Sequence, residues 1–307
     1  MDFTQLEMFV ATAEARGVQR AAERVFRSQP AVSMAMRKLE QEVGAPLFDR
    51  SMRGAYRLTA AGELLYASAK RLLTQREDAL AEVKDLHDLE RGRVRIGANE
   101  SAGNYLLPRL IYGFRKQHPK IRIDVTRQNS TELIRDLRDN AVDLALIAFR
   151  PESKEIEAAP VLMDGLILIV GANHRLARSR RVKLKGLASE SFIAHTVASP
   201  SRNRVVDAFR ASGTPLNIVM EVAMIETIKK LIAMNLGIGF IPEMCVQEEI
   251  ERGALVRVAV EDFSYERTLW LARRVSAAHS PAAAAFATTV LRGAKFMSGH
   301  RKEGEPA

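Results

Sequence analysis

Three polar side chains at steps of four residues have the chemistry to read the base edges of duplex DNA. They are Gln29, Ser33 and Arg37. On an α-helix, residues four apart lie on the same face. Gln and Arg can each make two hydrogen bonds to a purine in the major groove. The spacing therefore predicts a helix whose polar face meets base pairs.

The residues next to this face predict where the helix begins and ends. Ser28 is suited to cap the first turn. Pro30 is tolerated there because the first turn offers no intrahelical partner for its missing N–H. Gly44 is a common helix end. We therefore expect a helix over about residues 30–42, with Ser28, Gln29 and Pro30 in the DNA interface.

Two shorter helices and a wing complete the predicted domain. Apolar residues at helical spacing predict a helix over residues 3–13, and a second contains Ala21 and Ala22, small enough to let another helix approach closely. Downstream, Arg50 and Arg53 fall in a loop-and-strand segment from which they can contact phosphates. Each arginine taken alone is equally consistent with an ordinary solvated side chain. The ordered set is typical of a winged helix-turn-helix.

These motifs together resemble the N-terminal domain of LysR-type transcriptional regulators. The matching residues, in chain order, are Ala21-Ala22, Ser28 to Ser33, Leu39-Glu40, Leu47-Phe48 with Arg50, Leu58-Thr59 and Ala61-Gly62. The order of the elements behind them also fits that family over nearly the whole chain. The resemblance implies that the chain regulates transcription.

Three positions depart from the pattern of that family. Met34 and Ala35 stand where a polar or basic residue and a Gln are common, and Gly17 replaces the usual capping Ser. DNA contacts at Gln29, Ser33 and Arg37 therefore transfer more directly than any contact at Met34 or Ala35. We expect fewer base-edge hydrogen bonds than the family pattern implies.

A long helix is predicted over residues 60–89, with Thr59 as its N-cap. Leucine or alanine recurs at every seventh position: Leu58, Leu65, Leu72, Ala79 and Leu86. Such a seam can take a second helix, and paired subunits place two reading helices one DNA turn apart. We therefore expect a homodimer through this helix. A helix folded back on its own subunit is the alternative.

From residue 92 onward, short apolar strands alternate with helices, which predicts a mainly parallel sheet. Two similar halves, with a chain that crosses over and returns, enclose a cleft. This resembles the effector domain of the same family, which is similar to periplasmic binding proteins. The predicted fold class is therefore α+β and α/β, a winged helix-turn-helix, a linker helix and a two-lobed α/β effector domain. The predicted domains are 1–58 (DNA binding), 59–91 (linker and dimerisation), 92–161 with 268–295 and 162–267 (effector lobes), and 296–307 (disordered tail).

In open α/β folds a ligand binds beyond the carboxyl ends of the strands, where helix N-termini favour an anion. We therefore predict effector contacts in the loops at that edge, from Asn99, Ser101, Ser130, Thr131, Phe149, Thr196, Arg202 and Met224. Each Ser or Thr is equally explained as a helix cap without a ligand. Glu100 is an unfavourable neighbour for an anion, so it faces away, binds an amine of the ligand, or pairs with Arg202. His195 is expected to be a loop residue with its own partner.

Composition favours a cytoplasmic protein that binds anions. The 307 residues carry a formal net charge of +9. No apolar run reaches the roughly 18 residues of a membrane span, and Asp2, Gln5 and Glu7 interrupt what would be the core of a signal peptide. The densest basic run, residues 175–185, is either a solvated loop face or a contact with flanking DNA or a partner subunit.

An enzyme and a transport-type solute-binding protein explain the sequence less well. The chain lacks a Gly-rich phosphate loop, a nucleophile elbow and clustered metal ligands. Its single cysteine, Cys245, excludes an internal disulfide and is expected to be buried. A solute-binding protein leaves the first 90 residues without a role.

We therefore expect a non-enzymatic regulator, without cofactor or metal, that binds double-stranded promoter DNA. A small, anionic effector in the cleft is expected to shift the assembly between two arrangements. The resemblance implies a dimer of dimers, and RNA polymerase is a further candidate partner.

Overall fold

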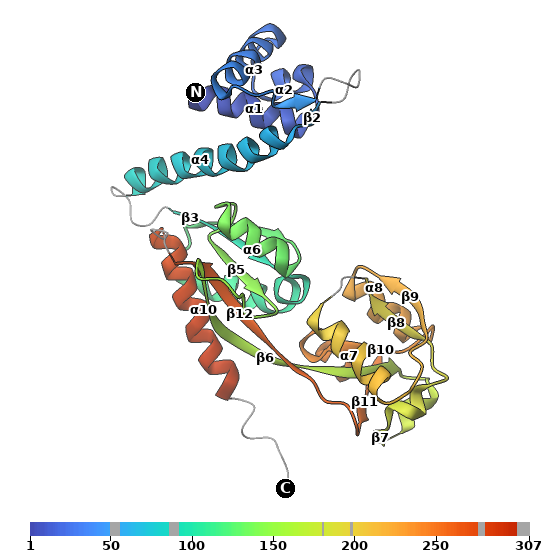
Figure 1. The fold of residues 1–307 in the computed structure, drawn as a ribbon. Coiled ribbons are helices and arrows are strands. Elements are labelled where there is room, and N and C mark those ends of the chain that lie inside the picture. Colours follow the sequence, from blue (N-terminus) through green and yellow to red (C-terminus); the bar gives the residue numbers. More distant parts are fainter. Residues whose placement is uncertain (50–55, 86–91, 180, 197–198, 276–279, 300–307) are drawn as a thin grey trace. The chain divides into compact units, whose positions relative to one another are not determined.

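The computed structural model describes residues 1–49, 56–85, 92–179, 181–196, 199–275 and 280–299. The chain divides into two compact units, one N-terminal and one C-terminal. The elements of the N-terminal unit are α1 (Phe3–Ala15), α2 (Val18–Arg24), α3 (Gln29–Val43), β1 (Phe48–Asp49), β2 (Arg57–Leu58) and α4 (Ala60–Asp85). All three predicted helices of the DNA-binding domain are thus present, followed by a short antiparallel ladder (Figure 1).

Helix α3 is fixed by the pattern that predicted it. Val32, Met36 and Leu39 are at most 4 % exposed and pack in one cluster with Phe9 of α1. Gly44 takes a φ of +73° at the C-cap, a conformation that residues with a side chain adopt only at a cost. One buried stripe and a glycine stop therefore set both the rotation and the length of α3.

The start of α4 is held against the DNA-binding core by Thr59 and Gly62. Thr59 Oγ1 accepts a hydrogen bond from the Gly62 N–H at 3.0 Å and donates one to the Pro46 carbonyl at 2.7 Å. A Cβ on Gly62 would lie 2.1 Å from the Leu47 carbonyl oxygen, so no larger residue fits. The predicted N-cap at Thr59 is confirmed.

The first turns of α4 pack on the domain they follow. Its residues Ala61, Leu65, Tyr66, Ala69 and Leu73 join the cluster of α1, α2 and α3. Leu65, one of the five predicted seam residues, is therefore partly buried within its own subunit, as the alternative expected. Leu72 and Ala79 are exposed as the seam requires, and Leu86 lies outside the described residues.

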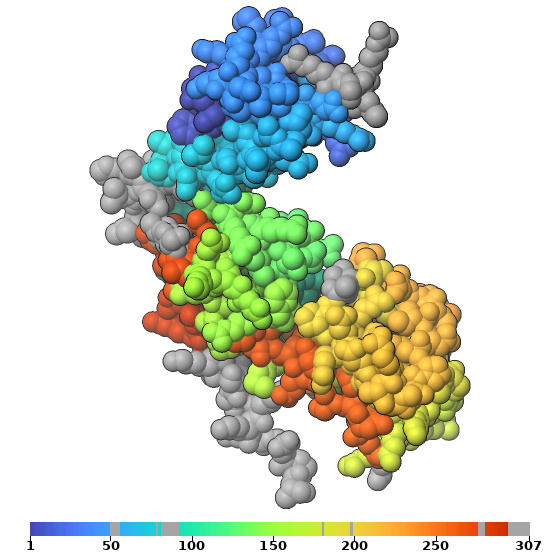
Figure 2. All heavy atoms as spheres, in the orientation of Figure 1, coloured from blue at the N-terminus to red at the C-terminus, as the bar shows by residue number. Residues whose placement is uncertain are grey.

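The C-terminal unit contains two lobes. Lobe I holds β3 (Arg93–Ala98), a π-helical turn (Ala102–Leu106), α5 (Leu107–Gln117), β4 (Arg122–Arg127), α6 (Ser130–Arg138), β5 (Leu144–Ile147) and α10 (Pro281–Gly299). Lobe II holds β7 (Arg181–Val182), β8 (Phe192–His195), α7 (Pro200–Ala211), β9 (Ile218–Val222), α8 (Ile225–Ala233), β10 (Gly239–Pro242), α9 (Gln247–Glu251) and β11 (Leu255–Val260). Two strands, β6 (Ile156–Gly171) and β12 (Glu266–Arg274), run between them, and the lobes abut in the space-filling view (Figure 2).

The prediction of a mainly parallel sheet is wrong for the strands that join the lobes. The order is β4-β3-β5-β12-β6-β11-β7, with β10 also paired to β6. Strands β3, β4 and β5 are parallel, as are β8 and β9. The ladders of β12 with β5 and of β6 with β10, β11 and β12 are antiparallel. A helical crossover indicates a parallel neighbour, whereas a strand that returns from the other lobe has no such local signal.

The predicted lobe boundaries fall inside strands. The positions 161–162 and 267–268 lie within β6 and β12, where Leu162 pairs with Leu269 and Asp164 with Arg267. Helix α10 continues through residues 296–299, which corrects the expectation that the disordered tail begins at 296. The segment 294–298 contains no Pro or Gly to end the helix earlier.

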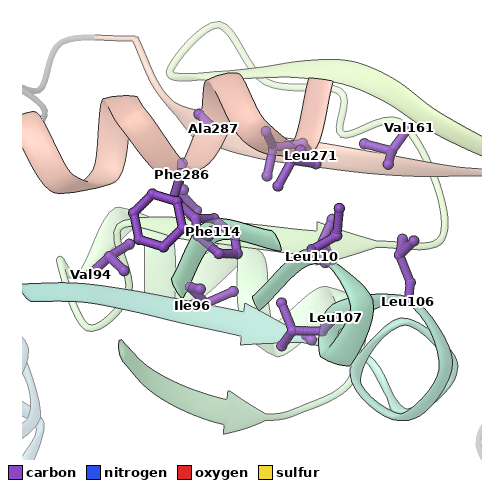
Figure 3. Close-up of a cluster of buried hydrophobic side chains, with 14 of the residues drawn as sticks. Val94, Ile96, Leu106, Leu107, Leu110, Phe114, Val161, Leu271, Phe286 and Ala287 are labelled. Atoms are coloured by element: carbon purple, nitrogen blue, oxygen red, sulfur yellow. The ribbon is translucent and has the colours of Figure 1, made fainter. Parts of the chain in front are cut away.

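Lobe I has a core centred on two phenylalanines. Phe114 of α5 and Phe286 of α10 meet edge to face, with ring centroids 5.0 Å apart, above Ile96 of β3 (Figure 3). Lobe II has its own clusters, one of them around Phe192 and Phe209. Each lobe therefore has a core of its own, although Tyr105 of lobe I also packs against a cluster of lobe II.

Candidate nucleic-acid interface and ligand cleft

Helix α3 presents an exposed surface at the positions that the sequence singled out. Ser28 is the N-cap, and its Oγ accepts a hydrogen bond from the Ala31 N–H at 3.4 Å. Ser33 is partly buried. The exposed side chains of α3 that form what we call the reading face are Gln29, Pro30, Met34, Arg37, Lys38 and Gln41.

The polar groups at the two ends of the reading face, Gln29 and Arg37, are not engaged by the part of the chain that the structure describes. Neither Gln29 nor Arg37 has a side-chain hydrogen bond or ion pair with any residue that the structure describes. Their side chains are therefore available for base edges without first breaking an internal contact. Arg50 and Arg53, the predicted wing contacts, lie outside the described residues. The ladder that precedes and follows them pairs Asp49 with Arg57.

A cavity of about 720 Å³ lies between lobe I and lobe II. It opens beyond the carboxyl ends of β3, β4 and β8, as the rule for open α/β sheets predicts. Six of the eight predicted effector residues line it: Asn99, Ser101, Ser130, Thr131, Phe149 and Arg202.

Thr196 and Met224 are not among the lining residues. Thr196 is exposed, one residue beyond the end of β8, and its backbone bonds to Val222 and Arg202. Met224 is the N-cap of α8 and is 52 % exposed. Both were selected because they follow a strand, a rule that places the backbone at the correct edge without fixing which side chains reach the cavity.

The Ser101 and Ser130 hydroxyls, which are expected to bind the ligand, are both bonded to the Asn99 side chain. Asn99 Oδ1 accepts from Ser101 Oγ at 3.3 Å and from the Ala102 N–H at 2.9 Å. Ser130 Oγ accepts from Asn99 Nδ2 at 3.4 Å and from the Ala148 N–H at 3.1 Å. Asn99, Ser101 and Ser130 are each at most 9 % exposed. They shape the wall of the cavity and hold the start of the π-helical turn against α6.

A buried ion pair behind this wall was not predicted from the sequence. The Arg267 guanidinium lies 2.9 and 3.0 Å from Asp164 Oδ2, and its Nη2 donates to Ser101 Oγ at 3.0 Å. Asp164 Oδ1 also accepts from the Met244 N–H at 3.0 Å. Arg267 lines the cavity, so it offers a cation to a ligand while it stabilises the strand crossing. The available signal was Asp164, the one charge in the otherwise apolar segment 158–171.

Glu100 bridges the cleft through contacts that none of the three alternatives named. Its Oε2 lies 3.0 Å from His195 Nε2, and its Oε1 accepts from the Ile225 N–H at 2.9 Å, at the start of α8. Arg127 lies 3.9 Å away. Burial raises the pKa of Glu100, but the hydrogen bonds from His195 and Ile225 outweigh it, so the pKa is lowered. Glu100 therefore pairs with His195 rather than Arg202.

Arg202 lines the cavity but is anchored to its own lobe. Its Nη1 donates to the carbonyls of His195 and Thr196 at 2.7 and 3.2 Å, and its Nη2 pairs with Glu221. The Ser199 hydroxyl caps α7, the helix that carries Arg202, by accepting a hydrogen bond from the Arg202 N–H at 3.2 Å. This arginine fixes the loop after β8 and shows only part of its charge to the cavity.

The charged side chains around the cavity are mostly cationic. Four are arginines, Arg127, Arg135, Arg202 and Arg267, and two are glutamates, Glu100 and Glu132. Arg135 is exposed, and no ion pair joins it to another described residue. Among the described residues, no group of three or more His, Cys, Asp or Glu is placed to hold a metal ion. The cavity is thus suited to an organic anion.

Cys245 is buried, as predicted. It is 1 % exposed, and burial raises the pKa of its thiol. At neutral pH the reactive thiolate is therefore scarce.

Two family models together cover nearly the whole chain. Residues 3–63 match the "bacterial regulatory helix-turn-helix protein, lysR family" model, and residues 87–295 match the "LysR substrate binding domain" model. The chain belongs to the LysR family of transcriptional regulators. This LysR-type regulator is 34 % identical over 295 residues to the RuBisCO operon transcriptional regulator of Allochromatium vinosum, covering 95 % of this chain and 96 % of that relative. It is 31 % identical over 279 residues to the regulator CfxR of Cupriavidus necator, covering 91 % and 87 %.

Solved structures show the same fold. The crystal structure of CbnR, a LysR family transcriptional regulator, aligns with a TM-score of 0.74 at 21 % identity, covering 96 % of this chain and 99 % of CbnR. The CcmR regulatory domain of Synechocystis, in complex with 2-PG, aligns with a TM-score of 0.62 at 24 % identity, covering 67 % of this chain and 99 % of that domain. The predicted architecture, a helix-turn-helix domain followed by a two-lobed α/β effector domain, is confirmed.

None of the described helices is both long and apolar enough to cross a lipid bilayer.

Proposed function

We propose that this LysR-type regulator binds promoter DNA through the reading face of α3 and responds to a small organic anion held between lobes I and II. The observation that carries the DNA-binding role is the unengaged pair Gln29 and Arg37 on a helix whose opposite side is fully buried. Ser28, Pro30 and Ser33 at the start of the same helix, with Arg50 and Arg53 of the wing, complete the proposed interface. The protein acts in the cytoplasm, where promoter DNA is found, and the cleft binds its ligand without transforming it.

The proposed effector is anionic because of the cations that face the cavity. Arg127 and Arg135 are both exposed, and the ion pair of Arg127 with Glu100 is long, at 3.9 Å. Asn99, Ser101, Ser130, Thr131 and Phe149 complete the proposed wall around the ligand. Glu100 is already matched by His195 and by the N-terminus of α8, so its charge opposes an anion less than its position suggests.

The proposed assembly is a homodimer, paired again into a dimer of dimers, with α4 as the dimer contact. Leu64 and Leu72 are 75 and 38 % exposed, and Ala79 is also exposed. At 3.6 residues per turn, Leu64, Leu72 and Ala79 lie within about 80° of one another on the helix. This stripe keeps Leu72 and Ala79 of the predicted seam but has Leu64 in place of Leu65, and it is the surface that a second copy of α4 would cover.

A thermal-shift screen tests the anionic effector. The full chain is titrated with inorganic phosphate, sulfate, dicarboxylates and phosphorylated short-chain acids. We expect at least one organic anion to raise the midpoint of unfolding, because a ligand that binds only the folded state stabilises it. Arg135→Ala should reduce that shift, whereas Arg178→Ala, an exposed arginine outside the cavity lining, should not. Cationic and neutral metabolites are screened in parallel, and stabilisation by these alone, with none by any anion, refutes the proposal.

A further inference from the structure

The centre of the reading face is occupied by an apolar side chain. Met34 is 68 % exposed and does not belong to the cluster that α3 shares with α1, α2 and α4. Exposing a large apolar side chain forgoes the stabilisation that burial would give. Nothing in the N-terminal unit therefore explains why residue 34 is a methionine.

The neighbours of Met34 mark the surface as one for DNA. At about 100° per residue, Pro30, Arg37 and Gln41 all lie within roughly 60° of Met34 around the helix axis. Arg37 and the adjoining Lys38 are exposed cations on the same side. A partner surface that matches this arrangement has anionic groups on either side, as the phosphates of DNA do, and an apolar group between them.

The major groove contains one such apolar group. Every base edge presents hydrogen-bond donors or acceptors there, but only thymine adds a C5-methyl group. The flexible, polarizable thioether of methionine adapts readily to a small apolar partner. A lysine or glutamine at residue 34 would gain a hydrogen bond there, whereas methionine gains only from covering a methyl.

We propose that Met34 is a specificity-determining residue that contacts the C5-methyl group of one thymine in each operator half-site. The inference rests on the proposed entry of α3 into the major groove and adds the identity of a base that it reads. It also assigns a role to a position where the chain departs from the pattern of its family.

Uracil substitution isolates the methyl group. After footprinting defines the bound site, each thymine is replaced in turn by deoxyuridine, which removes the methyl and preserves base pairing. Covering one methyl stabilises a complex by an amount that corresponds to about a fourfold change in Kd. We expect the full chain to lose about fourfold in affinity at one thymine per half-site.

The variants assign that thymine to Met34. Met34→Ala should bind the thymine and uracil sites equally, and Met34→Leu should retain the preference for thymine because it retains an apolar side chain. Gln41→Ala, on the same face, should leave the preference unchanged. Because Met34 is exposed, these changes leave the core intact, which equal unfolding midpoints will check.

Three results overturn the inference, and each differs from a failure of the proposed function. The first is specific binding that is indifferent to every uracil substitution. The second is a thymine preference that survives in Met34→Ala but disappears in Phe26→Ala, since Phe26 is 92 % exposed two residues before the cap of α3. The third is a loss of affinity in Met34→Ala that is equal for all DNA sequences, which indicates that Met34 contacts the sugar-phosphate backbone of DNA instead of a base. Failure of the proposed function would instead appear as no specific DNA binding by the unmodified chain.

Discussion

The reading face of α3 and the wall of the effector cleft use polar side chains in opposite ways. On α3, Gln29 and Arg37 are exposed and have no polar partner among the described residues. In the cleft, Ser101 and Arg267 are buried and bonded within the protein. A side chain on the reading face therefore contributes only to binding DNA, whereas a side chain in the cleft wall also stabilises the fold. Substitutions at the two places should separate binding from stability.

The largest effect is expected where the cleft wall is most engaged. Arg267→Met leaves the Asp164 carboxylate buried without its cation, so it should lower the free energy of unfolding by about 3–5 kcal/mol. Denaturant unfolding followed by circular dichroism measures the loss. Arg273→Met on the same strand is the matched control, because its pair with Glu157 is exposed and should contribute at most about 1 kcal/mol. Equal losses in the two variants would show that the buried pair is not special.

On the reading face the effect should appear in binding instead. Arg37→Ala should weaken specific relative to non-specific DNA binding by about 1–3 kcal/mol, because one bidentate base contact is lost. The same variant should unfold within about 0.5 kcal/mol of the original chain, since no described residue pairs with Arg37. Gel-shift titrations against operator and random DNA give the ratio of specific to non-specific affinity. Arg109→Ala, an exposed arginine of α5, should leave both quantities unchanged, and a ratio unaffected by Arg37→Ala would remove this arginine from base reading.

The smallest effect is a pH dependence carried by Glu100. Its pKa lies below the ordinary value of 4.5, so the ionised form stabilises the folded state. That contribution is fully present above pH 4.5 and is lost as the pH falls through the lowered pKa. Urea unfolding of the original chain and of Glu100→Gln, at pH 7 and at successively lower pH, should give a difference that shrinks with acid. A difference that is independent of pH would mean that the bridge does not depend on the carboxylate charge.

The sequence predicts the reading helix well because local features determine it. Ser28 caps the helix, Gly44 ends it, and Val32, Met36 and Leu39 set its rotation. Each of these acts within a few residues, so periodicity and capping rules are sufficient. The exposure of Met34 follows from the same periodicity, although its consequence for DNA reading required the structure.

The cleft is predictable in position but not in detail. The rule for strand ends located six of the eight proposed lining residues. It could not reveal that Asp164 meets Arg267, because they are 103 positions apart and meet only through the register of β6 and β12. Nor could it reveal that Glu100 bridges to His195, since that contact depends on how one lobe faces the other. Long-range register and lobe orientation are tertiary properties that single-sequence patterns do not encode.

The register of β6 against β12 has a consequence for how the lobes can move. Leu269 pairs with Leu162, but Trp270 pairs with Pro160, so Val161 is an extra residue that no partner opposes. Such an insertion bends a strand and increases its local twist, and Pro160 supplies no N–H there. The two connections between the lobes, β6 and β12, are continuous strands rather than loops. A change in the angle between the lobes would therefore require this pair of strands to bend elastically. Stiffness at this kink, more than the length of any linker, would then govern how far a bound anion can draw the two halves together.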